Sequence, residues 1–216
     1  MRFGVLGTGM VGTAIATKLV QLGHEVTMGS RTRGNERAQE WLQKIGDRGE
    51  VGTFADAAEF GELIFSCIAG VHTVEALEAS RRKNLEGKVV VDVANPLDFS
   101  HGMPPTLSVC NTDSLGEQIQ RVFRECRVVK ALNTMNCTVM VDPASVPGNH
   151  NAFICGSYEE AKRDVTDLLE TFGWPRPRIV DLGDIAASRG MEMYVALWLR
   201  FYGTVGGPHF NITLAS

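Results

Sequence analysis

Short apolar runs alternate with amphipathic stretches along almost the whole chain. The runs are rich in Val, Ile, Leu and Phe, which is typical of strands that are buried on both faces of a sheet. The stretches between them place apolar residues at helical spacing. The runs predict strands at 2–6, 25–28, 51–54, 62–68, 88–96, 127–132, 152–156 and 178–183. The stretches predict helices at 13–23, 35–45, from 55, from 70 through 77, and at 114–123, 157–172 and 191–202.

Strand and helix follow each other in turn, and this order specifies a parallel sheet with helices on both faces. We therefore predict an α/β fold of the Rossmann type, with a doubly wound, mostly parallel sheet. Residues 1–184 form the predicted Rossmann-like domain, with a core at 1–140 and an added strand–helix–strand unit at 150–184. Residues 185–216 form a C-terminal helix and tail.

The helix predicted at 191–202 is apolar on most of its sides, and a small protein does not leave such a helix in water. Three interpretations stay open: it belongs to the core, it forms a dimer interface, or it covers the active site. Two connections are also of interest. Residues 98–111 are predicted as a loop with adjacent prolines, either a flap over the site or a surface excursion, and 139–151 as a polar connection. Ser157 and Glu160 have the spacing of a capping box.

Composition narrows the function classes. The 216 residues carry a net charge of only −4 without blocks of like charge, so neither a nucleic acid nor an anionic membrane is the expected partner. No apolar run reaches membrane-spanning length, and the N-terminus lacks the order of a signal peptide, so we expect a cytoplasmic protein. The five cysteines are irregularly spaced without a C-x-x-C pair, which argues against disulfides and a zinc site.

A glycine-rich turn directly follows the first predicted strand and opens the first helix. Gly7 permits the tight turn, Gly9 leaves the backbone open to a pyrophosphate, and Gly12 allows the helix to pack closely on the strand. A strand, glycine turn and helix N-terminus in this order are typical of dinucleotide binding. The predicted cofactor-binding residues here are Gly7, Thr8, Gly9, Met10, Val11 and Gly12.

The residues after the second strand favour NADP over NAD. NAD-specific folds place a carboxylate there to bind the ribose 2′-hydroxyl, whereas this chain has Ser30 and Arg31, with Arg33 close by. A hydroxyl and guanidinium groups bind a 2′-phosphate that a carboxylate would repel. The alternative interpretation is a solvated basic loop.

Further candidates lie where other strands end, because ligands of doubly wound sheets gather outside the carboxyl ends of the strands. His72 either contacts the cofactor or begins a helix in solvent, and Asn95 either lines the nicotinamide side or initiates a turn. The candidates from these strand ends are Ile68, Ala69, His72, Ala94, Asn95, Asn133 and Thr134.

Four segments together resemble the F420-dependent NADP oxidoreductase family. They are GTGMVG at 7–12, GSR at 29–31, VVKALNT at 128–134 and IAASR at 185–189. The resemblance implies hydride transfer between NADPH and a deazaflavin coenzyme, and dimers that use the C-terminal part of the chain.

The resemblance also implies roles for individual residues. Thr8, Ser30 and Arg31 would bind NADP, and the strand ends near Ile68, Ala94 and Asn133 would face the nicotinamide. The archaeal deazaflavin-using members carry a histidine where this chain has Asn133, and residues 135–142 also differ. The family's bacterial relatives include proteins without an obvious deazaflavin partner. NADP is therefore the expected cofactor, with deazaflavin F420 or a flavin as second substrate.

The sequence assigns no catalytic residue. Hydride transfer between two flat rings needs alignment and exclusion of water rather than acid–base help. Reduction of a small carbonyl or imine would need a proton donor, for which His72, Asn133, Thr134 and Tyr194 are the candidates. Our leading hypothesis is an NADPH-dependent oxidoreductase with a flavin-like acceptor. The alternatives are a carbonyl or imine reductase, and an NADP-binding sensor without turnover.

Overall fold

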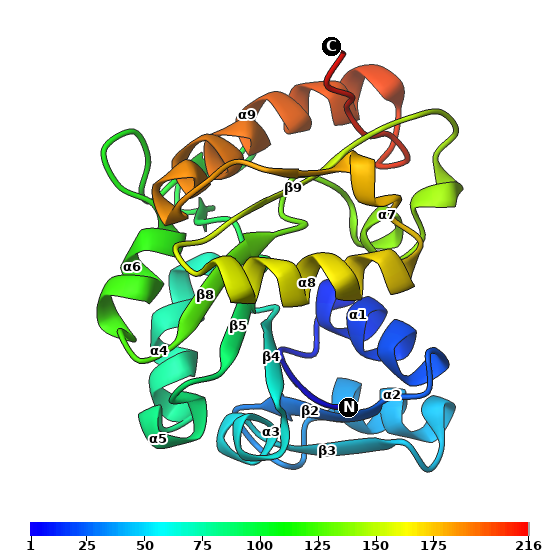
Figure 1. Ribbon diagram of the computed structural model, residues 1–216, viewed down its shortest axis with the longest axis vertical. Coiled ribbons are helices and arrows are strands. Elements are labelled where there is room, and N and C mark those ends of the chain that lie inside the picture. Colours follow the sequence, from blue (N-terminus) through cyan, green and yellow to red (C-terminus); the bar gives the residue numbers. More distant parts are fainter. Residues whose placement is uncertain (216) are drawn as a thin grey trace.

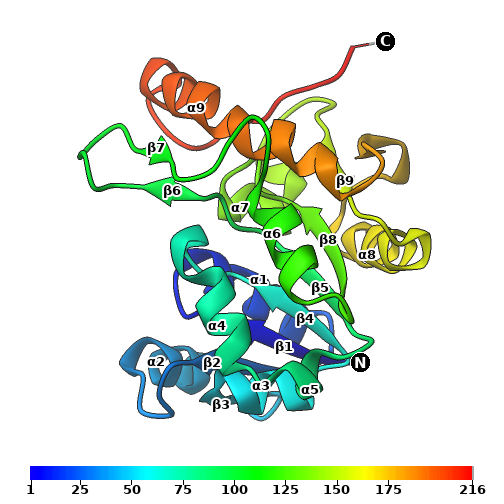
Figure 2. The ribbon, with the colours of Figure 1, turned by 90° about the vertical axis from the view of Figure 1, so that its left-hand side faces the viewer.

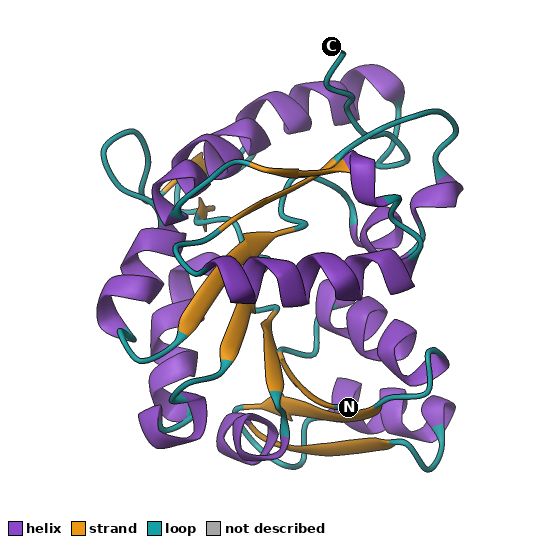
Figure 3. Cartoon of the chain, in the orientation of Figure 1, coloured by secondary structure: helices purple, strands orange, loops and turns teal. Residues whose placement is uncertain are grey.

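An eight-stranded sheet is the frame of the protein, which a computed structural model describes for residues 1–215 (Figure 3). The strand order is β10-β9-β8-β5-β4-β1-β2-β3. The strands are β1 Arg2–Leu6, β2 Glu25–Ser30, β3 Gly49–Thr53, β4 Leu63–Ser66, β5 Val89–Asp92, β8 Arg127–Ala131, β9 Ala152–Cys155 and β10 Ile179–Asp181. Residue 216, the last of the predicted tail, lies outside the described residues.

The six strands from β3 to β8 are all parallel, and their order reverses direction between β1 and β4. This is the Rossmann order, and its crevice for ligands lies outside the carboxyl ends at the reversal. β9 joins β8 in antiparallel fashion, and β10 pairs with β9 in parallel. The predicted doubly wound, mostly parallel sheet is therefore confirmed.

Helices cover both faces of the sheet and create two separate cores (Figures 1 and 2). The face with α1 and α8 buries Ile15, Trp41 and Leu169, and the opposite face buries Leu77, Leu85 and Ile119. The helices are α1 Met10–Gln21, α2 Glu36–Ile45, α3 Phe54–Phe60, α4 Thr73–Ala79, α5 Arg82–Leu85, α6 Leu115–Val122, α7 Cys137–Val141, α8 Glu159–Phe172 and α9 Ser188–Val205. Single 3₁₀ turns lie at Gly70–His72, Pro143–Ser145, Arg176–Arg178 and Ile185–Ala187.

The structure corrects two of the predicted connections. The loop at 98–111 is bounded by a small antiparallel hairpin, β6 Leu97–Asp98 with β7 Thr106–Leu107. The connection at 139–151 contains most of α7, because the side chain of Asn136 accepts a hydrogen bond from Thr138 N and caps a short helix there.

The predicted capping box before α8 is wrong. The N-cap residue is Tyr158, and it makes no side-chain capping bond. This helix start is instead held by the buried Lys162, whose Nζ lies 2.8 Å from Glu159 and 2.7 Å from Asp181, the last residue of β10. The ion pair between Lys162 and the distant strand β10 thus takes the place of the local capping bond that was expected from Ser157.

The C-terminal helix α9 is longer than predicted, and the tail after it returns to its own chain. Phe210 stacks on Trp198 of α9 with a centroid distance of 5.3 Å. Asn151, just before β9, donates its N–H to Ile212 O at 2.9 Å and accepts from Leu214 N at 2.7 Å. The C-terminal end therefore lies at the end of the molecule that carries α9, away from the N-terminus (Figure 1).

Candidate functional site

A cleft of about 380 Å³ opens at the carboxyl ends of β1, β2 and β4, where the strand order reverses. Three turns contribute to it, one after each of these strands. Of the residues predicted from the sequence, Gly7, Thr8, Gly9, Ser30, Arg31, Ile68, Ala69 and His72 line the cleft. The topology thus brings together residues that are up to 65 positions apart in the chain.

The three glycines of the first turn occupy three different environments. Gly7 has a φ of +115°, a conformation that side-chain-bearing residues rarely adopt. A Cβ on Gly12 would lie 2.1 Å from Gly7 O, so only glycine fits where α1 meets the turn. A Cβ on Gly9 would meet nothing within 4 Å. The space beside Gly9 is therefore open to a ligand, as a dinucleotide pyrophosphate requires.

Gly9 is also the N-cap of α1, and no side chain caps this end of the helix. The first turn of α1 carries no acidic residue, so its N–H groups and the positive end of the helix dipole suit an anion. Met10 and Val11 lie outside the cleft. Met10 is 80% exposed and faces a groove between α1 and α2, whereas Val11 packs against the core.

The two arginines after β2 have different surroundings. Arg31 lines the cleft next to the buried Ser30, and no carboxylate within residues 1–215 forms an ion pair with it. Arg33 lies outside the cleft and contacts Asp56 Oδ1 at 2.7 Å. Hydrogen bonds from Thr53, aided by Arg33, hold the pKa of Asp56 below its usual value, so this partner is ionised at neutral pH.

Asn35 is a lining residue that the sequence analysis missed. It caps α2 by accepting a hydrogen bond from Ala38 N at 3.1 Å, and it faces the same cleft as Ser30 and Arg31. The signal was available, because Asn directly before a predicted helix is a preferred N-cap, and a helix N-terminus beside a basic residue suits a phosphate.

The end of β4 forms the other side of the cleft. Ile68, Ala69 and the half-exposed His72 line it, together with Cys67. Burial raises the pKa of the Cys67 thiol, so this cysteine behaves as a small apolar residue.

The ends of β5 and β8 lie beyond this cleft and contact each other. Asn95 Nδ2 donates to Asn133 O at 2.8 Å, and Asn133 Nδ2 donates to Asn95 Oδ1 at 2.9 Å. Asn95 O in turn lies only 2.3 Å from the position that a Cβ on Gly70 would occupy, so these ends abut the turn that carries Ala69. Ala94 is buried beside Asn95.

The chain after β8 holds two buried polar atoms without partners. Leu132 has a φ of +63°, and the strained backbone at this position is followed by Asn133 and Thr134. Asn133 Oδ1 and Thr134 Oγ1 accept or donate no hydrogen bond within the described part of the chain. An amide oxygen can accept from the NH₂ of a carboxamide and a hydroxyl can donate to its oxygen, so these two unpaired groups on adjacent residues fit a nicotinamide at this end.

The sequence analysis also missed three buried charged residues behind these strand ends, namely Asp92, Lys130 and Glu192. Lys130 Nζ lies 2.7 Å from Asp92 Oδ2 and 2.8 Å from Glu192 Oε1. The available signal was a charged residue inside an apolar strand or helix, which is rarely buried unless it has a partner.

The family described as NADP oxidoreductase, coenzyme F420-dependent, matches residues 2–96 of this chain. The F420-dependent NADP reductase of Methanocaldococcus jannaschii is 28% identical over 206 residues, which cover 91% of this chain and 90% of that protein. Metalloreductase STEAP3 of Rattus norvegicus is also 28% identical, over 88% of this chain but only 36% of its own length.

Solved structures show the same fold over nearly the whole chain. A candidate F420-dependent NADP reductase from Arthrobacter sp. FB24 is 45% identical, with 99% of each chain covered and a TM-score of 0.94. A reductive aminase from Aspergillus terreus, solved in complex with NADPH and ethyl levulinate, is 21% identical over 95% of this chain and 62% of its own, with a TM-score of 0.66. The second likeness is one of fold.

Proposed function

The chain belongs to the F420-dependent NADP oxidoreductase family, and we propose that it transfers hydride between NADP(H) and a deazaflavin or flavin ring. It is an NADP-dependent oxidoreductase, and the acceptor is the part of its function that is proposed. The observation that carries the NADP(H) half of the proposal is the cleft itself, which combines an open glycine turn with Ser30 and with Arg31, an arginine that pairs with no carboxylate of residues 1–215. The strand ends beyond it hold amides and a hydroxyl.

The proposed position of NADP(H) follows the order of the lining residues. The 2′-phosphate lies at Ser30, Arg31 and the N-terminus of α2, where Asn35 is the cap. The pyrophosphate lies over Gly9 and the N-terminus of α1, beside Thr8. The nicotinamide half extends past Ala69 to the ends of β5 and β8.

Bound NADPH supplies a hydride from its nicotinamide ring. The residues of this chain then have two tasks, to hold the ring in one orientation and to keep water away from it. The Asn95–Asn133 pair and Thr134 serve the first task. Burial raises the pKa of Tyr194 of α9 to about 12, and its buried hydroxyl has no hydrogen-bond partner among the described residues.

Replacing Arg31 with alanine tests the cofactor assignment. We expect Arg31→Ala to weaken NADPH binding about tenfold to a hundredfold, because a charged hydrogen bond to the 2′-phosphate is lost. NADH lacks this phosphate, so its affinity should stay nearly constant. Arg33→Ala should weaken NADPH less, since Arg33 already binds Asp56. Arg124→Ala, an exposed arginine outside the cleft, serves as a control. Equal losses for NADPH and NADH would contradict the assignment.

The acceptor is tested by mixing the purified protein with NADPH and, separately, oxidised F420, flavin mononucleotide and a panel of carbonyls and imines. Rapid NADPH oxidation by F420 or the flavin, and slow oxidation by the panel, is the expected result. Oxidation by a carbonyl or imine alone would make the protein a reductase of that class. Tight NADPH binding without oxidation by any of them would indicate a sensor.

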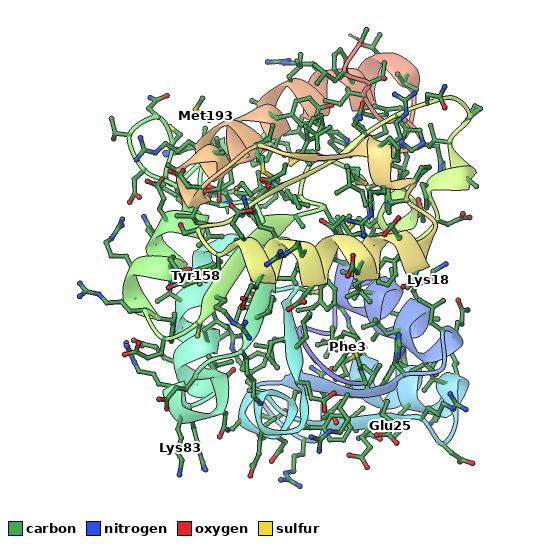
Figure 4. All side chains as sticks on the ribbon, viewed as in Figure 1. Phe3, Lys18, Glu25, Lys83, Tyr158 and Met193 are labelled. Carbon is green, nitrogen blue, oxygen red and sulfur yellow. The ribbon has the colours of Figure 1, made fainter. Side chains whose placement is uncertain are left out.

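We also propose that α9 pairs with a second copy of the chain, which makes residues 185–216 an interface rather than only a cover. Its outer face carries the apolar side chains Met193, Leu197 and Val205, of which Leu197 is 50% exposed. Figure 4 shows Met193 on this helix at the surface of the molecule.

None of the helices within residues 1–215 has the length and apolarity for crossing a membrane. The cytoplasmic location stays a prediction.

A further inference from the structure

Three charged side chains form a closed network behind the ends of β5 and β8. Asp92 and Lys130 are 0% exposed and Glu192 is 1% exposed. Lys130 Nζ contacts Asp92 Oδ2 at 2.7 Å, Glu192 Oε1 at 2.8 Å and Ala94 O at 2.6 Å. An ammonium group has three N–H donors, so every donor of Lys130 is used.

The positive charge of Lys130 is maintained in this network, whereas burial raises the pKa of Glu192 above its usual value. Burial alone would lower the pKa of Lys130, but the charges of Asp92 and Glu192 raise it above its usual value. Glu192 accepts hydrogen bonds from Leu115 N at 2.9 Å and Gly116 N at 3.0 Å. These two N–H groups begin α6, so the carboxylate of α9 also satisfies a helix N-terminus.

The network holds both backbone polar groups of Ala94. Asp92 Oδ1 accepts from Ala94 N at 3.1 Å, and Lys130 donates to Ala94 O. The next residue, Asn95, exchanges hydrogen bonds with Asn133. Asn133 Nδ2 also donates to Met191 O at 3.1 Å, one residue before Glu192. Two adjacent residues of α9 are therefore connected to the strand ends at which the nicotinamide half is proposed to bind.

Stability alone does not account for such a network. Well-packed apolar residues of similar volume usually stabilise a core as well as a buried ion pair does, because the ions must be removed from water. Unlike apolar contacts, the hydrogen bonds of these charged groups are directional, so each of them fixes the position of one backbone or side-chain atom. The atoms so fixed belong to Ala94, to the start of α6 and to the charged groups themselves.

We infer that Asp92, Lys130 and Glu192 are positioning residues that fix the Asn95–Asn133 pair for the nicotinamide half of NADP(H), and that they make this half-site depend on α9. The inference rests on the proposed function. The adenosine half of the cofactor is bound by the turns after β1 and β2, which the network does not contact. The two halves should therefore respond differently when the network is removed.

The test removes all three charges while keeping the side-chain volumes, in the variant Asp92→Asn/Lys130→Met/Glu192→Gln. Dissociation constants for NADPH and for 2′,5′-ADP, which carries only the adenosine half with its 2′-phosphate, are measured by titration calorimetry. We expect NADPH to bind about tenfold more weakly or worse, and 2′,5′-ADP to change less than about twofold.

Lys162→Met is the matched control. Lys162 is also a buried lysine, 4% exposed, between two carboxylates, but these partners lie on α8 and β10 and not on β5 or α9. This variant should leave the ratio of the two dissociation constants unchanged. If the triple variant does not fold, the same two dissociation constants are measured for Glu192→Gln, which removes one charge at constant size, and their ratio then tests the inference.

An unchanged ratio in a folded network variant would overturn the inference and leave the network a structural feature only. A ratio that changes equally in Lys162→Met would overturn it as well, because any loss of a buried charge would then suffice. Failure of the wild-type protein to bind 2′,5′-ADP would instead contradict the proposed function, so the two failures are distinguishable.

Discussion

In the glycine turn, some glycines are required by the fold itself, and another leaves space for a ligand. Gly7 and Gly12 are needed by the protein itself, because one adopts a positive φ and the other contacts the backbone of the first. Gly9 meets no such restriction, and its φ of −77° is open to any residue. Arg31 and Arg33 differ in the same way, since only Arg33 has an ion-pair partner in the fold among the described residues.

The contrast predicts opposite results for two alanine substitutions. Gly9→Ala should cost less than about 1 kcal/mol of stability, as expected for an N-cap change, but should weaken NADPH binding at least about tenfold. Gly12→Ala should lower the free energy of unfolding by about 1–3 kcal/mol, because its Cβ overlaps Gly7 O. Urea unfolding and NADPH titration measure both effects. A Gly9→Ala protein with wild-type NADPH affinity would contradict the proposed pyrophosphate position.

At the scale of elements, α6 is held at its N-terminus by other parts of the chain. Ser114 caps it locally, and Ser114 Oγ lies 2.7 Å from Ser188 Oγ at the start of α9. Arg189 of α9 donates to Glu117 at 2.8 Å. Asp113, just before the cap, pairs with Arg121 in the last turn of α6. The helix is therefore fixed by charges on both sides of its cap.

The Asp113–Arg121 pair makes a pH-dependent contribution to stability. The hydrogen bond from Arg121 lowers the pKa of Asp113 to about 2, below its value in the unfolded chain. The stabilisation is therefore complete above about pH 4 and is lost as the pH falls towards 2. We expect Asp113→Asn to lower the free energy of unfolding by about 0.5 kcal/mol at pH 7 and by nearly nothing at pH 2.

Urea unfolding at the two pH values measures this difference. Asp164→Asn, at an exposed position of α8 for which no described residue supplies an ion pair, is the control and should show no pH-dependent effect. Equal destabilisation of Asp113→Asn at both pH values would show that the side chain stabilises α6 without its charge.

The whole molecule combines a complete Rossmann sheet with an edge extension that carries α9. β9 and β10 lengthen the sheet beyond β8, and α9 then returns to the carboxyl ends of the parallel strands. One side of α9 is buried through Met191, Glu192 and Val195, and the other side exposes apolar residues. An exposed apolar helix face of this kind is typical of an interface.

A charge on the outer face of α9 tests the proposed pairing of two chains. We expect Leu197→Glu to weaken self-association by on the order of a hundredfold or more, since the carboxylate would be buried without a partner. Sedimentation velocity over a range of concentrations measures this. Phe99→Glu, at an exposed apolar residue next to the β6–β7 hairpin, is the control and should leave the association unchanged. A wild-type protein that is monomeric at all concentrations would contradict the proposal.

The sequence by itself determined the parallel sheet, because most of its strands, such as β1, β4 and β5, are apolar runs and the helices between them carry apolar residues at helical spacing. It also indicated the lining residues Gly7, Thr8, Gly9, Ser30 and Arg31, since the turn after a strand is local in sequence. Strand ends farther along, such as Asn95 and Asn133, could be predicted as neighbours of the site from the topology alone.

Only the tertiary structure decided how distant charges pair. The partners of Lys130 lie 38 and 62 residues away, and no local spacing relates them. Likewise, Asp56 forms an ion pair with Arg33 and not with Arg31. Asp181 forms an ion pair with Lys162 at the helix start where a local capping box was expected. Hydrophobic periodicity is a property of neighbours in the chain, whereas a buried charge is satisfied by whichever group the fold places within hydrogen-bond distance.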